Sequence, residues 1–130
     1  MRLAIDTNAY VAFARGSADI SEAIRRASHI VLPYIVVAEL RAGFRSGAQN
    51  RKNEAIFQRF LASERVSIAF ADEQTTHHYA TLFSELRRRG KPIPTNDLWI
   101  AALCLQNDLL LWSYDQHFRL IEQLPVLPHR

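Results

Sequence analysis

The sequence has one cysteine, two lysines and no long apolar run, and these absences exclude several classes of protein. Cys104 cannot form an internal disulfide, which excludes the disulfide-rich secreted scaffolds, and its apolar surroundings predict a buried, inert thiol. The longest uncharged apolar run, residues 27–38, contains Pro33 and is too short to cross a bilayer. Asp6 interrupts the apolar stretch that a signal peptide would need. We therefore expect a cytoplasmic protein without a membrane segment.

Linkers and repeats are also absent, so we predict a single domain over residues 1–130. The chain is 48% hydrophobic and 22% charged, which is typical of a globular protein. Only Lys52 and Lys91 of the 16 basic residues are lysines, so 14 are arginines, whose planar group suits phosphate. Basic side chains cluster near a Gly/Ser turn at Arg41, Arg45 and Arg51, although cations are also ordinary at helix ends. A net charge of +3 permits a nucleic-acid partner without requiring one.

Short apolar runs alternate with stretches of helical periodicity, which predicts an α/β fold with a parallel sheet covered on both faces. The expected strands are residues 2–5, 29–32, 66–70, 109–112 and 126–127. The expected helices are residues 10–14, 17–27, 33–47, 50–63, 72–90, 98–105 and 115–121. We predict that Asp72 caps the fifth of these helices and that Asn96 or Asp97 opens the sixth.

Four acids occupy junctions between these elements. Asp6 follows the first strand, Asp115 follows the fourth, and Asp97 begins the helix that leads into the fourth. Glu39 lies in an apolar helical stretch about one turn after the second strand. If the first strand lies between the second and the fourth, Asp6 and Asp115 flank the point where strand order reverses, and such sheets bind ligands there. Each acid also has a simpler interpretation, because Asp is a good helix cap and Glu39 can lie on an exposed helix face.

Convergence of the four acids on one cleft would require protonation or a cation. At separations of roughly 6–7 Å and an effective dielectric constant near 20, six like-charge pairs cost on the order of 15 kcal/mol. No small domain tolerates that cost unaided. Oxygen ligands without a nearby His or Cys cluster favour Mg²⁺ or Mn²⁺ over zinc, and Asn8 and Thr95 are expected to support the acids by hydrogen bonding. We do not assign His117 to the site, although its place near Asp115 leaves contact with phosphate or the acids open.

A divalent site made of acids, with no nucleophile beside it, points to phosphodiester hydrolysis. The metal would lower the pKa of a bound water and neutralise charge on the leaving oxygen. Because such catalysis is mostly electrostatic, Asp→Asn substitutions are expected to abolish it nearly completely while the fold stays intact.

Four segments, in this order, resemble the motifs of the PIN-domain nucleases: LAIDTNAYVAF, VVAELRAG, PTNDLWIAA and LLWSYDQHF. The similarity covers essentially the whole chain, and the compact form is similar to the VapC-type toxins. The resemblance implies a three-layer α/β/α sandwich with a mostly parallel sheet of four to five strands. It also implies that Asp6, Glu39 and Asp97 are the metal-binding catalytic acids and that Asp115 is the fourth, more variable acid. Ser113 replaces the Thr that many members carry two residues before the fourth acid, and it keeps the hydroxyl as a supporting group.

The same resemblance implies a function and partners. The expected activity is Mg²⁺- or Mn²⁺-dependent endoribonuclease cleavage of a structured RNA, such as transfer or ribosomal RNA, by the toxin of a type II toxin–antitoxin system. The expected partner is a VapB-type antitoxin whose carboxy-terminal segment threads the groove and often brings an Arg to the acids, and a homodimer is also expected. Two alternatives remain open, namely a PIN-type nuclease in RNA or DNA processing and a non-catalytic RNA-binding module on the same fold.

Overall fold

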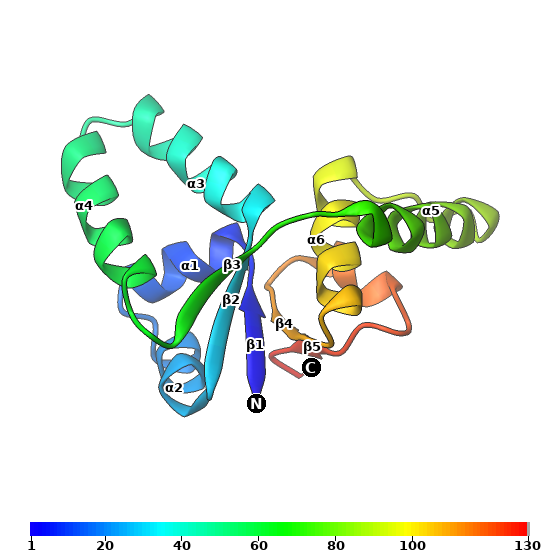
Figure 1. Cartoon of the computed structure of the whole chain (residues 1–130), viewed down its shortest axis with the longest axis horizontal. Helices are drawn as coiled ribbons and strands as arrows, with labels where there is room; N and C mark the ends of the chain where they lie inside the picture. The colour runs from blue at the N-terminus through cyan, green and yellow to red at the C-terminus, as the bar shows by residue number, and fades with distance from the viewer. Residues whose placement is uncertain (130) are drawn as a thin grey trace.

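The computed structural model describes residues 1–129, which fold around one five-stranded sheet (Figure 1). The strands are β1 (Arg2–Ile5), β2 (His29–Pro33), β3 (Val66–Ala69), β4 (Leu110–Trp112) and β5 (Val126–Leu127). Their order is β3-β2-β1-β4-β5, and every neighbouring pair is parallel. All five predicted strands are therefore present, and β1 lies between β2 and β4, which is the condition under which Asp6 and Asp115 meet.

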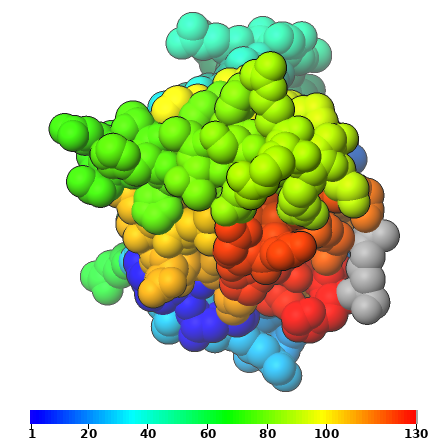
Figure 2. Space-filling model, turned by 90° about the vertical axis from the view of Figure 1, so that its right-hand side faces the viewer, coloured from blue at the N-terminus to red at the C-terminus, as the bar shows by residue number. Residues whose placement is uncertain are grey.

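Helices cover both faces of the sheet. Figure 1 shows four on one side of it, namely α1 (Thr7–Ala14), α2 (Ala18–Arg26), α3 (Tyr34–Ser46) and α4 (Asn50–Leu61). On the other side lie α5 (Glu73–Arg88) and α6 (Thr95–Gln106), and a short 3₁₀ helix, η1 (Gln116–Leu120), follows β4. In Figure 2, α5 forms a green ridge across one face of the molecule, above the orange and red chain that follows α6. The predicted three-layer α/β/α sandwich is confirmed.

Two helices begin earlier than predicted, and both starts bear on the acids. α1 begins at Thr7 because the Asp6 carboxylate accepts a hydrogen bond from the Ala9 N–H and caps the helix. α6 begins at Thr95 with Pro94 as its cap residue, so the prediction that Asn96 or Asp97 opens this helix is wrong. Asp97 instead lies in the first turn, where the helix dipole stabilises a negative charge.

The core lies between the sheet and the helices. Residues 3–5 of β1 are fully buried, which agrees with a central parallel strand covered on both faces. α6 is apolar around most of its circumference because it packs between the sheet and α5. Cys104 on this helix is completely buried, as predicted, and burial raises the pKa of its thiol to about 12. Asp72 caps α5 as predicted, in a capping box with Thr75.

Within residues 1–129, no helix is both long and apolar enough to cross a membrane. The predicted domain ends at residue 130, which lies outside the described residues. That residues 1–130 form one domain stays a prediction.

We expect Phe57→Ala to destabilise the protein by about 3–5 kcal/mol, because it removes a fully buried ring and leaves a cavity. The Phe57 ring packs edge-on against Tyr10 at 5.1 Å between centroids and against Phe44 at 5.8 Å. Urea denaturation measures the loss. Ile56→Ala, on the same helix at a partly exposed residue, is the matched control and should cost far less. Equal losses in the two variants would contradict the assignment of Phe57 to the core.

Candidate active site

The carboxyl ends of β1 and β4 place two of the predicted acids at one edge of the sheet. Asp6 directly follows β1, and its side chain is buried, with 5% of the residue exposed. Its carboxylate accepts hydrogen bonds from the Ala9 N–H at 2.9 Å and from the Ser113 hydroxyl at 2.5 Å. The same Ser113 oxygen accepts a hydrogen bond from the Asp115 N–H at 3.0 Å. One buried hydroxyl therefore connects the segments that carry Asp6 and Asp115.

His117 lies against Asp97 and Asp115. Its Nδ1 is 2.9 Å from Asp97 Oδ2 and 3.1 Å from Asp115 Oδ1. The Asp115 carboxylate also accepts the His117 backbone N–H at 2.9 Å and so caps η1. One ligand atom from each of the three residues lies within 4.8 Å of the other two. Sequence reasoning did not assign His117 to the site. His117 lies two residues after an Asp that caps a short helix, so the two side chains lie at the same end of that helix. This spacing was the signal available in the sequence.

Glu39 reaches the site from α3 and is held by two donors that were not predicted. Its carboxylate accepts hydrogen bonds from the Thr7 hydroxyl at 2.7 Å and from the Asn96 side-chain amide at 3.4 Å. Thr7 belongs to α1 and Asn96 to α6. The Glu39 side chain therefore links three helices at the edge of the sheet.

Asn8 and Thr95 do not make the contacts predicted for them. Both residues are exposed, and neither side chain hydrogen-bonds an acid within residues 1–129. Thr7 and Asn96, one position away in each motif, make such contacts instead. Successive helical residues point about 100° apart, so a small error in the expected start of a helix selects the wrong side chain.

Burial and mutual repulsion make ionisation of two acids unfavourable. Burial raises the pKa of Asp6 to about 6, although hydrogen bonds from Ser113 and the Ala9 N–H lower it, and the charges of Asp115 and Asp97 raise it further. Burial also raises the pKa of Asp97, against the hydrogen bond from His117, and the charges of Asp115 and Glu39 add to that rise. The structure thus brings all four predicted acids into one electrostatic group.

The donor set of this group fits a divalent cation. The contacts of His117 reach Asp97 through Oδ2 and Asp115 through Oδ1, so the three residues offer carboxylate oxygens and one ring nitrogen to the same point. Carboxylate oxygens are the preferred ligands of Mg²⁺ and Mn²⁺. A cation here would also offset the repulsion that raises the pKa of Asp6 and Asp97. Such a centre can activate a water and stabilise negative charge on a phosphate.

Residues 3–124 of this chain match the family model of the PIN domain. The chain belongs to the PIN-domain family. Ribonuclease VapC2 of Haemophilus influenzae is 30% identical to it over 115 residues, which are 87% of this PIN-domain chain and 86% of the relative. Ribonuclease VapC1 of the same species is 35% identical over 86 residues, which are 66% of this chain. That match spans 63% of VapC1, less than two thirds of its length.

A solved structure has the same PIN-domain fold. It is the crystal structure of VapBC2 from Rickettsia felis bound to a DNA fragment from their promoter. One of its chains is 25% identical to this protein, with a TM-score of 0.86 over 98% of each chain. The family resemblance and the fold class expected from the four sequence motifs are therefore confirmed.

We predict that Asp6→Asn changes how the metal-free PIN domain responds to pH. The folded state binds the Asp6 proton more tightly, with a pKa of about 6, than an unfolded chain with a pKa near 3.8. The protonated side chain therefore contributes its full stabilisation below about pH 4, and this contribution is lost as the pH rises to about 6. The free energy of unfolding falls by up to about 3 kcal/mol over this range. Asn still caps α1 but carries no charge, so the variant should lack this loss and be more stable than wild type at pH 7.5.

Urea denaturation from pH 4 to pH 8 in the presence of a chelator measures this difference. Asp108→Asn, at an exposed residue before β4 and so at the opposite end of that strand from Asp115, is the control and should follow the wild-type curve. Parallel curves for wild type and Asp6→Asn would show that burial of Asp6 does not alter its ionisation.

Proposed function

We propose that this PIN domain is the ribonuclease toxin of a VapBC-type toxin–antitoxin pair and hydrolyses RNA phosphodiester bonds with Mg²⁺ or Mn²⁺. The observation that carries the proposal is the gathering of Asp6, Glu39, Asp97 and Asp115 at the carboxyl edge of the sheet as one electrostatic group. The VapC relatives are named ribonucleases, and the similar solved structure is a VapBC complex, which supports the toxin assignment.

The residues of the site have distinct tasks in this proposal. Asp97 and Asp115 would hold the cation through their carboxylate oxygens, and Asp6 and Glu39 would complete the acidic ligand set. When bound, the cation lowers the pKa of the attacking water and neutralises charge on the scissile phosphate. Ser113 fixes the Asp6 carboxylate, and Thr7 fixes that of Glu39. These hydrogen bonds keep the acids oriented before substrate arrives, which is the main requirement of electrostatic catalysis.

The proposed substrate is a structured RNA, such as transfer or ribosomal RNA, and the proposed site of action is the cytoplasm. The chain carries a net charge of +3 with arginine as its main cation. Arg45 and Arg51 line one surface pocket, are exposed, and make no hydrogen bond or ion pair within residues 1–129. Exposed arginines of this kind are available to bind the RNA backbone.

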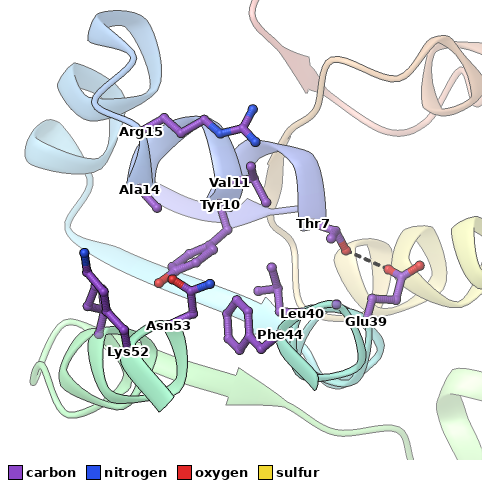
Figure 3. Close-up of a pocket in the computed structure, with 12 residues that line it drawn as sticks. Thr7, Tyr10, Val11, Ala14, Arg15, Glu39, Leu40, Phe44, Lys52 and Asn53 are labelled. Carbon is purple, nitrogen blue, oxygen red and sulfur yellow. Dashed lines mark hydrogen bonds between the residues drawn. The ribbon is translucent and has the colours of Figure 1, made fainter. Parts of the chain in front are cut away.

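A groove beside Glu39 fits the proposed antitoxin segment. The groove, of about 550 Å³, lies between α1, α3 and α4 (Figure 3). Thr7 and Glu39 stand at one end, and Arg15 and Lys52 at the other (Figure 3). The other residues that line the groove are mostly apolar and include Tyr10, Val11, Leu40, Phe44 and Ile56. A VapB-type carboxy-terminal segment would suit this groove if it carried apolar side chains, with a cation near Glu39. The homodimer expected from the family resemblance stays a prediction.

We expect purified protein, free of antitoxin, to cut total RNA into discrete fragments with Mg²⁺ or Mn²⁺ and to stop when a chelator is added. Asp97→Asn should lower the cleavage rate by at least on the order of 100-fold, because it removes a charged ligand of the cation that would stabilise the transition state. The matched control is Asp108→Asn, an exposed residue with a left-handed backbone that Asn also tolerates, and it should keep full activity. If the wild type binds RNA but cuts none with either metal, the non-catalytic alternative is correct.

The antitoxin groove has a separate test. Ile56→Glu places a charge in the apolar part of the groove, so we expect at least about tenfold weaker binding of the small protein encoded by the neighbouring gene. RNA cleavage by this variant should be unchanged, because Ile56 is on α4, whereas the four acids follow β1 and β4 or lie on α3 and α6. Phe70→Glu, at an aromatic residue that is 70% exposed and outside the groove, is the control. Unchanged affinity for Ile56→Glu, measured by calorimetry, would move the antitoxin to another surface.

A further inference from the structure

We infer that His117 is a nitrogen ligand of the divalent cation and that it makes this centre prefer Mn²⁺ to Mg²⁺. The inference rests on the metal-dependent function proposed above and extends it to one residue and one choice of ion. An acid-only site was expected from the sequence, in part because no His cluster stood near the acids. The structure changes that premise, because the imidazole lies between two of the four carboxylates.

The geometry around His117 Nδ1 matches that of neighbouring ligands on one ion. Ligand atoms at adjacent corners of an octahedron, about 2.1 Å from the metal, lie about 3 Å apart. Nδ1 lies 2.9 Å from an Asp97 oxygen and 3.1 Å from an Asp115 oxygen. In the metal-free protein Nδ1 is hydrogen-bonded to Asp97 and lies in close contact with the Asp115 carboxylate. A cation that replaces the proton of this hydrogen bond would keep the same three residues as neighbours, and the proton would leave to solvent.

The imidazole is held in place by the chain around it. The His117 N–H donates to the capping Asp115 carboxylate, and the next residue, Phe118, is almost completely buried. These two contacts fix η1 on the sheet and aim the His117 ring at Asp97. The side chain is 44% exposed, so its outer nitrogen can keep a proton and hydrogen-bond to water, as metal-bound histidines commonly do.

A nitrogen ligand discriminates between the two candidate ions. Mg²⁺ binds oxygen almost exclusively and keeps several waters, whereas transition-metal ions accept imidazole readily. Exchange of one oxygen ligand for Nδ1 therefore adds binding free energy for Mn²⁺ and little for Mg²⁺. The carboxylates of Asp97 and Asp115 keep the site suitable for hard cations. The nitrogen ligand therefore shifts the preference between the two proposed ions, Mg²⁺ and Mn²⁺, towards Mn²⁺.

The test uses the full chain loaded with Mn²⁺ and pulsed electron paramagnetic resonance, which detects a directly coordinated ¹⁴N nucleus. We expect an imidazole ¹⁴N coupling in the wild type, and no such coupling in His117→Gln. Calorimetric titration should show Mn²⁺ binding weakened by about 10–100-fold in this variant, with a much smaller change for Mg²⁺. His77→Gln, an exposed histidine on α5, is the matched control and should keep the coupling and both affinities.

Thermal melting without metal checks that His117→Gln is folded, and His117→Asn replaces it if it is not. The inference would be overturned if the wild type bound Mn²⁺ without a ¹⁴N coupling, or if the variant lost equal affinity for both ions. Either result would leave the proposed metal centre standing. Failure of the wild type to bind Mn²⁺ or Mg²⁺ at all would instead overturn the proposed metal-dependent function, and this inference with it.

Discussion

Burial of carboxylates that also repel one another, at one edge of a sheet, is the constraint on which the rest of this site depends. The charges of Asp115 and Asp97 disfavour ionisation of Asp6, and the charges of Asp115 and Glu39 disfavour ionisation of Asp97. The neighbouring residues offset this cost with hydrogen-bond donors. The hydroxyl of Ser113 donates to Asp6, the hydroxyl of Thr7 donates to Glu39, the imidazole of His117 is hydrogen-bonded to Asp97, and the His117 backbone N–H donates to Asp115. Supporting residues that look unrelated in the sequence thus have one common physical purpose.

The topology explains why acids so distant in sequence can meet. β1 is central, so the segment after it lies beside the segments that follow β2 and β4. Parallel strands end at the same edge, which puts Asp6 and Asp115 close together without any special loop. The other two acids come from helices that cross this edge, α3 for Glu39 and α6 for Asp97. Two acids are therefore positioned by strand ends and two by helix packing.

Much of this arrangement could be predicted from the sequence, because apolar runs and helical periodicity are local signals and parallel sheets follow few topologies. The five strands and the cap of α5 at Asp72 were accessible in this way, whereas the central place of β1 was only a condition of the argument. Helix starts were less accessible, since Pro94 rather than an Asx residue precedes α6, and the supporting donors were consequently misplaced by one residue. The role of His117 depends on Asp97, 20 residues earlier, and no local pattern encodes that contact.

The central position of β1 also has a consequence for biosynthesis. Asp6 leaves the ribosome 109 residues before Asp115, which at 5–20 residues per second is on the order of ten seconds. During this interval β1 can pair with β2 on one side, but its other edge has no partner until β4 is made. The hydroxyl of Ser113, which fixes Asp6, arrives with that last part of the sheet. A nascent chain therefore cannot assemble the acidic centre until the segment that carries Ser113 and Asp115 has left the ribosome.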